Sequence, residues 1–159
     1  MKLNHHARRL FFTVSLALIA ALLWNPPALE AKTGALTAPP PAEFQLLGFF
    51  DPGFTYLDYG SNGISDNGNK SVDTQATTLA KQSVSYVGAT FYLERWTGEQ
   101  WISVGNPVSN YSTNKSYHSN GVTFSAMSGF YYRVRTVHWV NHGSTQESGE
   151  VVSGYVLVQ

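Results

Sequence analysis

From Phe44 to the end of the chain, apolar and polar residues alternate in short runs, and glycine, asparagine, aspartate and serine separate these runs. No apolar repeat with the 3.6-residue period of a helix extends beyond two turns. A period of two residues is typical of half-buried β-strands, so the pattern predicts an all-β domain. The expected segments are Phe54–Tyr59, Ser71–Thr78, Val84–Trp96, Trp101–Val104, 109–121 (loop or weak edge strand), Val122–Met127, Phe130–Val140 and a last strand ending at Gln159.

The segment Val84–Trp96 carries the strongest strand signal. Alternation places Phe91 and Leu93 on one face of this strand and Glu94 on the other, where an arginine such as Arg133 on a neighbouring strand could pair with it. About seven short strands separated by turns are what two packed sheets require. The sequence therefore predicts a single two-sheet β-sandwich.

The first residues of the chain have the composition of a secretory signal peptide. A short basic segment precedes the apolar run Leu10–Trp24, which is shorter than the about 20 residues of a transmembrane helix. We expect a signal helix within residues 1–31, with cleavage after Ala31 or alternatively after Ala35, and a secreted protein. An uncleaved membrane anchor is the other interpretation. Residues 32–43 are predicted to be a Pro-rich linker, and residues 44–159 the sandwich domain.

The charge balance excludes some classes of partner. Ten Lys and Arg residues face ten Asp and Glu residues, and the formal net charge is +0. A neutral surface offers no electrostatic attraction for nucleic acid or for an anionic membrane, so we expect neither partner once the signal is removed. The chain has no cysteine, so packing must stabilise the fold without a disulfide.

Several segments resemble those of known secreted domains. The aromatic residues and Arg-Val-Arg of Phe130–Val137 are similar to the penultimate strand of fibronectin type III and related immunoglobulin-like domains. Together with Tyr92–Trp101, Gly129–Arg135, His138 and Gly143–Ser148, they make the chain resemble a group of uncharacterised small secreted proteins of Gram-positive bacteria. The resemblance implies secretion and an immunoglobulin-like or fibronectin type III-like sandwich. It implies no activity, because this group has no assigned chemistry.

The histidines do not have the spacing of a metal site on strands. His138 and His142 would lie on one face about 13 Å apart, too far to share an ion, and His118 is isolated. We therefore predict no metal and no cofactor. Calcium is an alternative, because four aspartates fall in turns or near strand ends, although without EF-hand spacing. These aspartates are Asp51, Asp58, Asp66 and Asp73.

The chain has no motif of a catalytic nucleophile. It lacks cysteine and any Gly-x-Ser-x-Gly elbow. Glu94 and Glu99 flank a tight turn and could form the carboxylate pair of a small extracellular glycoside hydrolase. The interpretation of Glu94 as the polar member of an alternating strand is favoured, and the protein is predicted not to be an enzyme.

Aromatic side chains are the candidate binding residues. Trp101, Tyr131 and Trp139 lie on predicted strands whose opposite face is already filled, and Tyr131 and Trp139 would share a face with Arg133 and Arg135. Such a row could stack on sugar rings, or the arginines could cover it. We predict a secreted, non-enzymatic extracellular binding or structural module whose partner is an unknown protein or glycan. A carbohydrate-binding module that uses these three aromatic residues is the first alternative, and the hydrolase is the second.

Overall fold

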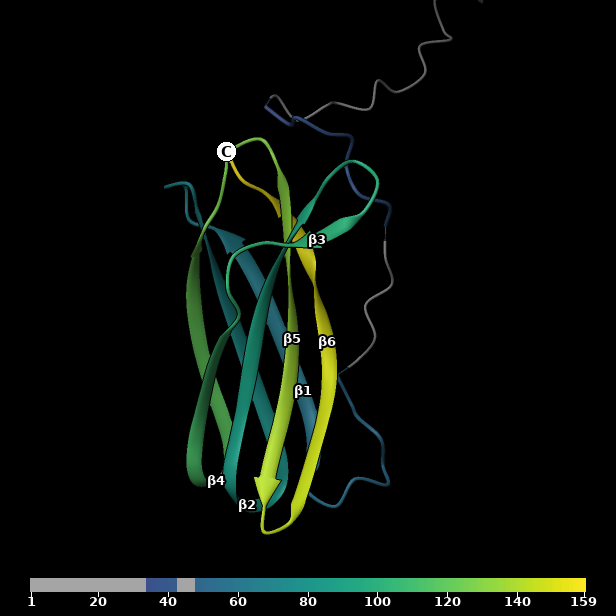
Figure 1. Cartoon of the computed structure of the whole chain (residues 1–159), viewed down its shortest axis with the longest axis vertical. Helices are drawn as coiled ribbons and strands as arrows, with labels where there is room; N and C mark the ends of the chain where they lie inside the picture. Colours follow the sequence, from purple (N-terminus) through teal and green to yellow (C-terminus); the bar gives the residue numbers. More distant parts are fainter. Residues whose placement is uncertain (1–33, 43–47) are drawn as a thin grey trace, which may run out of the picture. The chain divides into compact units, whose positions relative to one another are not determined.

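The computed structural model describes residues 34–42 and 48–159 (Figure 1). In this part of the chain every regular element is a β-strand, and no helix is long and apolar enough to cross a membrane. The predicted signal helix and signal peptide lie outside the described residues. The strands are β1 (Leu57–Asp66), β2 (Ser71–Trp96), β3 (Trp101–Ser103), β4 (Val108–Ser125), β5 (Tyr131–His142) and β6 (Thr145–Leu157).

Strand β2 joins two segments that the sequence predicted as separate strands. It is 26 residues long. Within Val72–Thr78 the even-numbered residues are buried, whereas within Val87–Leu93 the odd-numbered hydrophobic residues are buried. This change of parity follows a shift in the pairing with β4 between Leu79 and Val84. The exposed polar residues at the shift resemble a turn in the sequence, although the backbone continues as a strand.

Strand β4 runs beside β2 along nearly its whole length. The sequence predicted its first part as loop or weak edge strand, and the structure makes it an 18-residue strand. Among the described residues its only pairing partner is β2. Asn114 has a φ of 52°. Asparagine tolerates this left-handed conformation, which lies between the pairs Val84–Lys115 and Tyr86–Thr113, next to the shift in pairing.

The six strands form one antiparallel sheet. The first half of β2 pairs with β1 and the second half with β5, which in turn pairs with β6. The sheet curls on itself as a half-barrel (Figure 1). The all-β prediction is confirmed. The two separate sheets predicted for an immunoglobulin-like or fibronectin type III-like sandwich are not formed, because β2 and β4 pair with each other on both sides of the bend and so belong to one sheet.

The core lies on the concave side of the curled sheet. One apolar cluster, which includes Val87 and Val140, lies near the bend, and two further clusters around Phe91 and Tyr132 lie away from it. Burying one such side chain contributes about 1.5–3 kcal/mol. Between these clusters the interior also holds buried polar side chains, among them His138.

Side chains connect β1 and β6, which face each other across the open side of the sheet. The Glu147 carboxylate on β6 accepts backbone N–H groups of Thr55, Tyr56 and Leu57 at 2.5, 2.8 and 2.7 Å. Burial alone would raise the pKa of Glu147, but these three hydrogen bonds and the charge of Lys81 hold it below its ordinary value. The carboxylate thus stabilises the seam in its ionised form.

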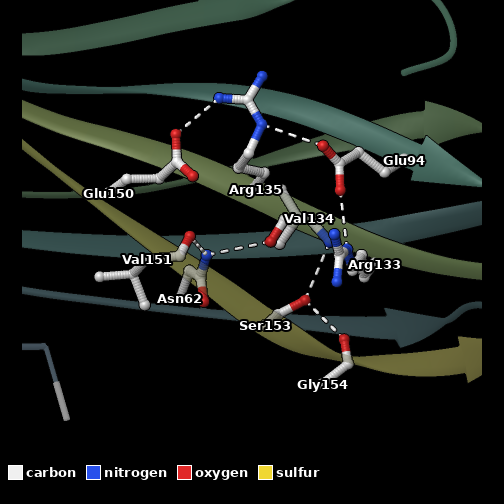
Figure 2. A network of polar contacts seen from close by, with 9 residues as sticks. All are labelled: Asn62, Glu94, Arg133, Val134, Arg135, Glu150, Val151, Ser153 and Gly154. Atoms are coloured by element: carbon white, nitrogen blue, oxygen red, sulfur yellow. Dashed lines mark hydrogen bonds and ion pairs between the residues drawn. The ribbon is translucent and has the colours of Figure 1, made fainter. Parts of the chain in front are cut away.

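Asn62 makes a second connection across the seam. Its Nδ2 atom donates to the Val151 carbonyl at 2.8 Å and lies 3.2 Å from the Val134 carbonyl (Figure 2). Nearby, the Ser153 hydroxyl accepts the Val134 N–H at 2.9 Å, where the pairing of β5 and β6 shifts. The side chains replace ladder hydrogen bonds that the backbone does not make at these points.

Candidate functional site

The outer face of the sheet over β2, β4, β5 and β6 carries the candidate residues. Along β5 the even-numbered residues from Tyr132 to Val140 are buried. Alternation therefore turns Arg133, Arg135 and Trp139 outward. This agrees with the sequence prediction that these arginines share a face with the aromatic residues.

An ion-pair network crosses the middle of this face (Figure 2). The Glu94 carboxylate accepts Arg133 Nε at 2.7 Å and Arg135 Nε at 3.0 Å, and Arg135 also binds Glu150 at 2.8 Å. Glu94 lies directly opposite Arg133, so the predicted cross-strand pairing is confirmed. Glu99, the other residue of the hydrolase hypothesis, is exposed in the turn between β2 and β3.

One aromatic cluster lies at the β3 end of the face. We call Trp96, Trp101, Tyr131 and Tyr155 the groove cluster. The ring centroids of Trp96 and Trp101 are 5.3 Å apart, and those of Tyr131 and Tyr155 are 5.7 Å apart. The Arg133 guanidinium lies 4.4 Å from the centroid of Trp101. An arginine thus covers this ring, as in the alternative interpretation that the arginines cover the aromatic row. Tyr131 is buried and Trp101 is half-buried.

A second aromatic cluster lies toward the bend. We call Tyr86, Tyr111 and Trp139 the platform. Tyr86 and Tyr111 are 45% and 57% exposed. Their centroids are 5.7 Å apart, and Tyr111 is 6.1 Å from Trp139. Tyr131 and Trp139 are eight residues apart on β5, which corresponds to about 26 Å. The three predicted binding residues are therefore divided between two places.

Gly88 supports the platform from below. A Cβ atom on this residue would lie 2.6 Å from Trp139 Cζ2 and 2.8 Å from Tyr111 Cβ. The absence of a side chain thus lets the indole lie close to the β2 backbone, and Trp139 Nε1 donates to the Thr90 hydroxyl at 3.2 Å. Sequence reasoning missed Tyr86 and Tyr111, although a glycine inside a strand is a signal of such close approach.

A pocket of about 400 Å³ opens beside the platform. Trp139 forms one part of its lining, and the remainder is polar. Amide and hydroxyl groups can both donate and accept hydrogen bonds, so this lining suits a ligand rich in hydroxyl groups. The other lining residues are Asn141, Gln146, Glu147 and Ser148.

The histidines are separate structural residues. His138 lies in the interior and makes a 2.7 Å hydrogen bond with Thr78, whereas His142 Nδ1 lies 3.1 Å from the Ser85 backbone nitrogen. His118 Nδ1 lies 3.0 Å from the hydroxyl of a serine on the same strand, and burial lowers its pKa. Within residues 34–42 and 48–159, no three His, Cys, Asp or Glu side chains come together as a metal site.

The aspartates of the calcium hypothesis take part in local hydrogen bonds. Asp51 and Asp66 accept the N–H of the glycine two residues later at 2.8 and 3.0 Å, which is the hydrogen bond of an Asx-turn. Asp73 accepts the Thr123 hydroxyl at 2.6 Å. Asp58 is exposed at the start of β1. Turn formation and strand pairing thus account for three of the four carboxylates.

Comparisons with known proteins add no relative to this description. The chain matches no family model, no curated protein and no solved structure.

Proposed function

We propose that this protein is a secreted, non-enzymatic binding module and that the platform of Tyr86, Tyr111 and Trp139 is its ligand-binding face. Secretion rests on the signal-like pattern of residues 1–31 and on the resemblance to small secreted bacterial proteins. A binding role is favoured over hydrolysis because both oxygens of Glu94 pair with arginines, which leaves this carboxylate poorly suited to catalysis.

The ligand class that fits this face best is a neutral glycan. Aromatic rings offer flat apolar faces to the C–H faces of sugars, and the adjoining amide and hydroxyl groups can bind sugar hydroxyls. An exposed aromatic patch rimmed by polar residues is typical of an interaction site. The carbohydrate-binding alternative is therefore favoured, with a different set of binding residues. Trp139 remains in this set, and Tyr86 and Tyr111 belong to it instead of Trp101 and Tyr131.

The observation that carries this proposal is the fixed position of the rings above Gly88. The Trp139 indole is held by the glycine below it and by its hydrogen bond to Thr90. A side chain that is already ordered loses little conformational entropy on binding. The platform is thus pre-organised while its two tyrosines remain exposed.

Native affinity electrophoresis and calorimetry with soluble neutral polysaccharides, such as a xylan, a β-glucan and a galactomannan, test the proposal. We expect Tyr111→Ala to weaken binding about tenfold, or about 1.4 kcal/mol. Tyr117→Ala is the matched control, because Tyr117 lies on the same strand and is 53% exposed but is not part of the platform. It should bind as the unaltered protein does.

Trp139→Phe provides a second, milder change. Phenylalanine keeps an aromatic ring over Gly88 but loses the hydrogen bond to Thr90, so binding should weaken while the fold is retained. If none of the polysaccharides is bound, or if Tyr111→Ala and Tyr117→Ala weaken binding equally, the platform is not a glycan site.

A further inference from the structure

The Pro-rich segment 34–42, which the sequence suggests is a linker, lies against the sheet. In Figure 1 this segment, in dark blue, runs beside the hairpin that carries β3. The Leu36 N–H donates to the Gly129 carbonyl at 2.7 Å. Trp96 Nε1 donates to the Ala38 carbonyl at 3.1 Å, and the Tyr155 hydroxyl donates to the Pro40 carbonyl at 3.4 Å. Two side chains of the groove cluster, those of Trp96 and Tyr155, thus bind two backbone carbonyl groups of the segment.

The part of the segment that carries the three prolines is extended. Residues 38–41 contain no turn or bend, whereas the backbone bends at Leu36 and Thr37. Pro40 is buried, whereas Pro39 and Pro41 on either side of it are exposed. A polyproline II helix has three residues per turn, so a run of three prolines directs one of them toward a surface, and here that residue is Pro40. Thr37, at the bend, is half-buried, and its hydroxyl oxygen is fully buried.

The receiving surface has the chemistry of known polyproline-binding grooves. Such grooves are lined by aromatic rings, and their N–H and O–H groups bind the carbonyls of a backbone that lacks proline N–H donors. Here Trp96 and Tyr155 supply these two donors. The Trp101 ring lies between them, with centroids at 5.3 Å from Trp96 and 6.3 Å from Tyr155.

Gly129 lets the start of the segment lie close to the backbone that precedes β5. A Cβ atom at Gly129 would lie 2.7 Å from Leu36 Cγ and 2.9 Å from the Gly34 carbonyl oxygen. Gly129 also has a φ of 85°, a conformation that other residues rarely adopt. The close approach of the segment thus depends on a residue without a side chain.

From these contacts we propose that the groove cluster is a binding site for proline-rich peptide, and that the chain's own segment 36–41 occupies it. The external ligand is a proline-rich segment of another polypeptide. Like the internal segment, it offers backbone carbonyl groups as acceptors and lacks N–H donors at its prolines. Because the internal segment is tethered, its effective concentration reaches the millimolar range, and it suppresses weaker external peptides. The site uses none of the platform residues and does not depend on the proposed glycan binding.

The experiment measures binding of a fluorescein-labelled peptide with the sequence of residues 34–43 by fluorescence anisotropy. The full chain is compared with a variant in which Pro39, Pro40 and Pro41 are all changed to serine. The variant weakens the internal occupant and leaves the groove unaltered. We expect it to bind the peptide at least about tenfold more tightly than the unaltered chain does. A peptide with serine in place of the three prolines should not bind.

Two substitutions test the groove itself, each made in the background of the triple serine variant. Trp96→Phe and Tyr155→Phe remove the donors to the segment and leave an aromatic ring at each position. Each should weaken peptide binding several-fold, whereas Tyr86→Phe on the platform should not change it. Circular dichroism and thermal unfolding verify that each variant keeps the β-fold.

Three results would overturn the inference. The peptide could bind neither protein, the unaltered chain and the triple serine variant could bind it equally, or the two groove substitutions could leave binding unchanged. Loss of glycan binding by the platform variants bears only on the proposed function. The two ideas therefore fail separately.

Discussion

Acidification should destabilise this protein through His138. The His138 side chain is 0% exposed. The Thr78 hydroxyl donates its only hydrogen to the Gly88 carbonyl at 3.0 Å, so it must accept the Nδ1–H of His138 at 2.7 Å. Nε2 of His138 then carries an unshared pair, and no group of the described residues forms a hydrogen bond with it. A proton added there would create a buried cation without an acceptor.

The size of the effect follows from the pKa of His138. Burial lowers this pKa from 6.5 to about 4. Between these two values the unfolded chain binds the proton and the folded protein does not, so the free energy of unfolding falls as the pH falls. At about 1.4 kcal/mol for each pH unit, the loss reaches about 3 kcal/mol at pH 4. This is a large part of a typical total of about 5–15 kcal/mol.

Urea unfolding at pH 7, 6, 5 and 4 measures this loss, with His138→Gln as the comparison. Glutamine can replace the hydrogen bond to Thr78 but does not titrate. The unaltered protein should lose about 3 kcal/mol more than the variant between pH 7 and pH 4, which moves the midpoint by at least about 1 M urea. Other groups that titrate, such as His118, contribute to both proteins and cancel.

Two results would refute this reasoning. One is a difference in unfolding free energy between the two proteins that stays constant from pH 7 to pH 4. The other comes from NMR of the imidazole of His138, which should remain neutral at pH 5.5, where an exposed histidine is mostly protonated. A ring that is charged at this pH would show that burial does not control its titration.

Two further predictions concern stability, each with a matched control. Glu147→Gln should destabilise the protein by about 2 kcal/mol at pH 7, because it weakens three backbone hydrogen bonds across the seam, whereas Glu150→Gln on the exposed part of β6 should cost about 0–1 kcal/mol. Because the folded pKa of Glu147 is lowered, this gap is present above pH 4.5 and should close as the pH falls further. Gly88→Ala should cost about 1–3 kcal/mol by displacing Trp139, whereas Gly63→Ala, with no atom within 4 Å of the added carbon, should be neutral or slightly stabilising in thermal melts.

The outer face of the sheet carries two aromatic sites with the ion-pair network between them. Along β5 the order is Tyr131 in the groove cluster, Arg133 and Arg135 in the network, and Trp139 in the platform. In the network, the Arg135 guanidinium also lies 4.1 Å from the ring centroid of Tyr92. Arg135 therefore covers the ring of Tyr92 in the middle of the face, and Arg133 covers that of Trp101 at the β3 end, whereas Tyr86 and Tyr111 of the platform remain exposed.

Some of the candidate site could be predicted from neighbouring positions alone. The sequence placed Glu94 opposite an arginine and put both arginines on the aromatic face, and the register of β2 and β5 agrees. These inferences needed only the two-residue period of a strand and one correct pairing of segments. The prediction that Trp101, Tyr131 and Trp139 form one binding surface depended on how far these residues lie from one another in the folded sheet, and the two-residue period of a strand gives no such distance.

The sequence by itself determined that the described domain is all-β and which side of most strands is buried, because alternation is a local property of an extended backbone. Only the tertiary structure decided that Ser71–Trp96 is one bent strand, that the sheet curls instead of dividing, and that segment 34–42 lies on the groove cluster. These features depend on contacts between residues far apart in the chain. A bend with exposed polar residues and a turn have the same local pattern, and a proline-rich segment has the same sequence whether it is free or bound.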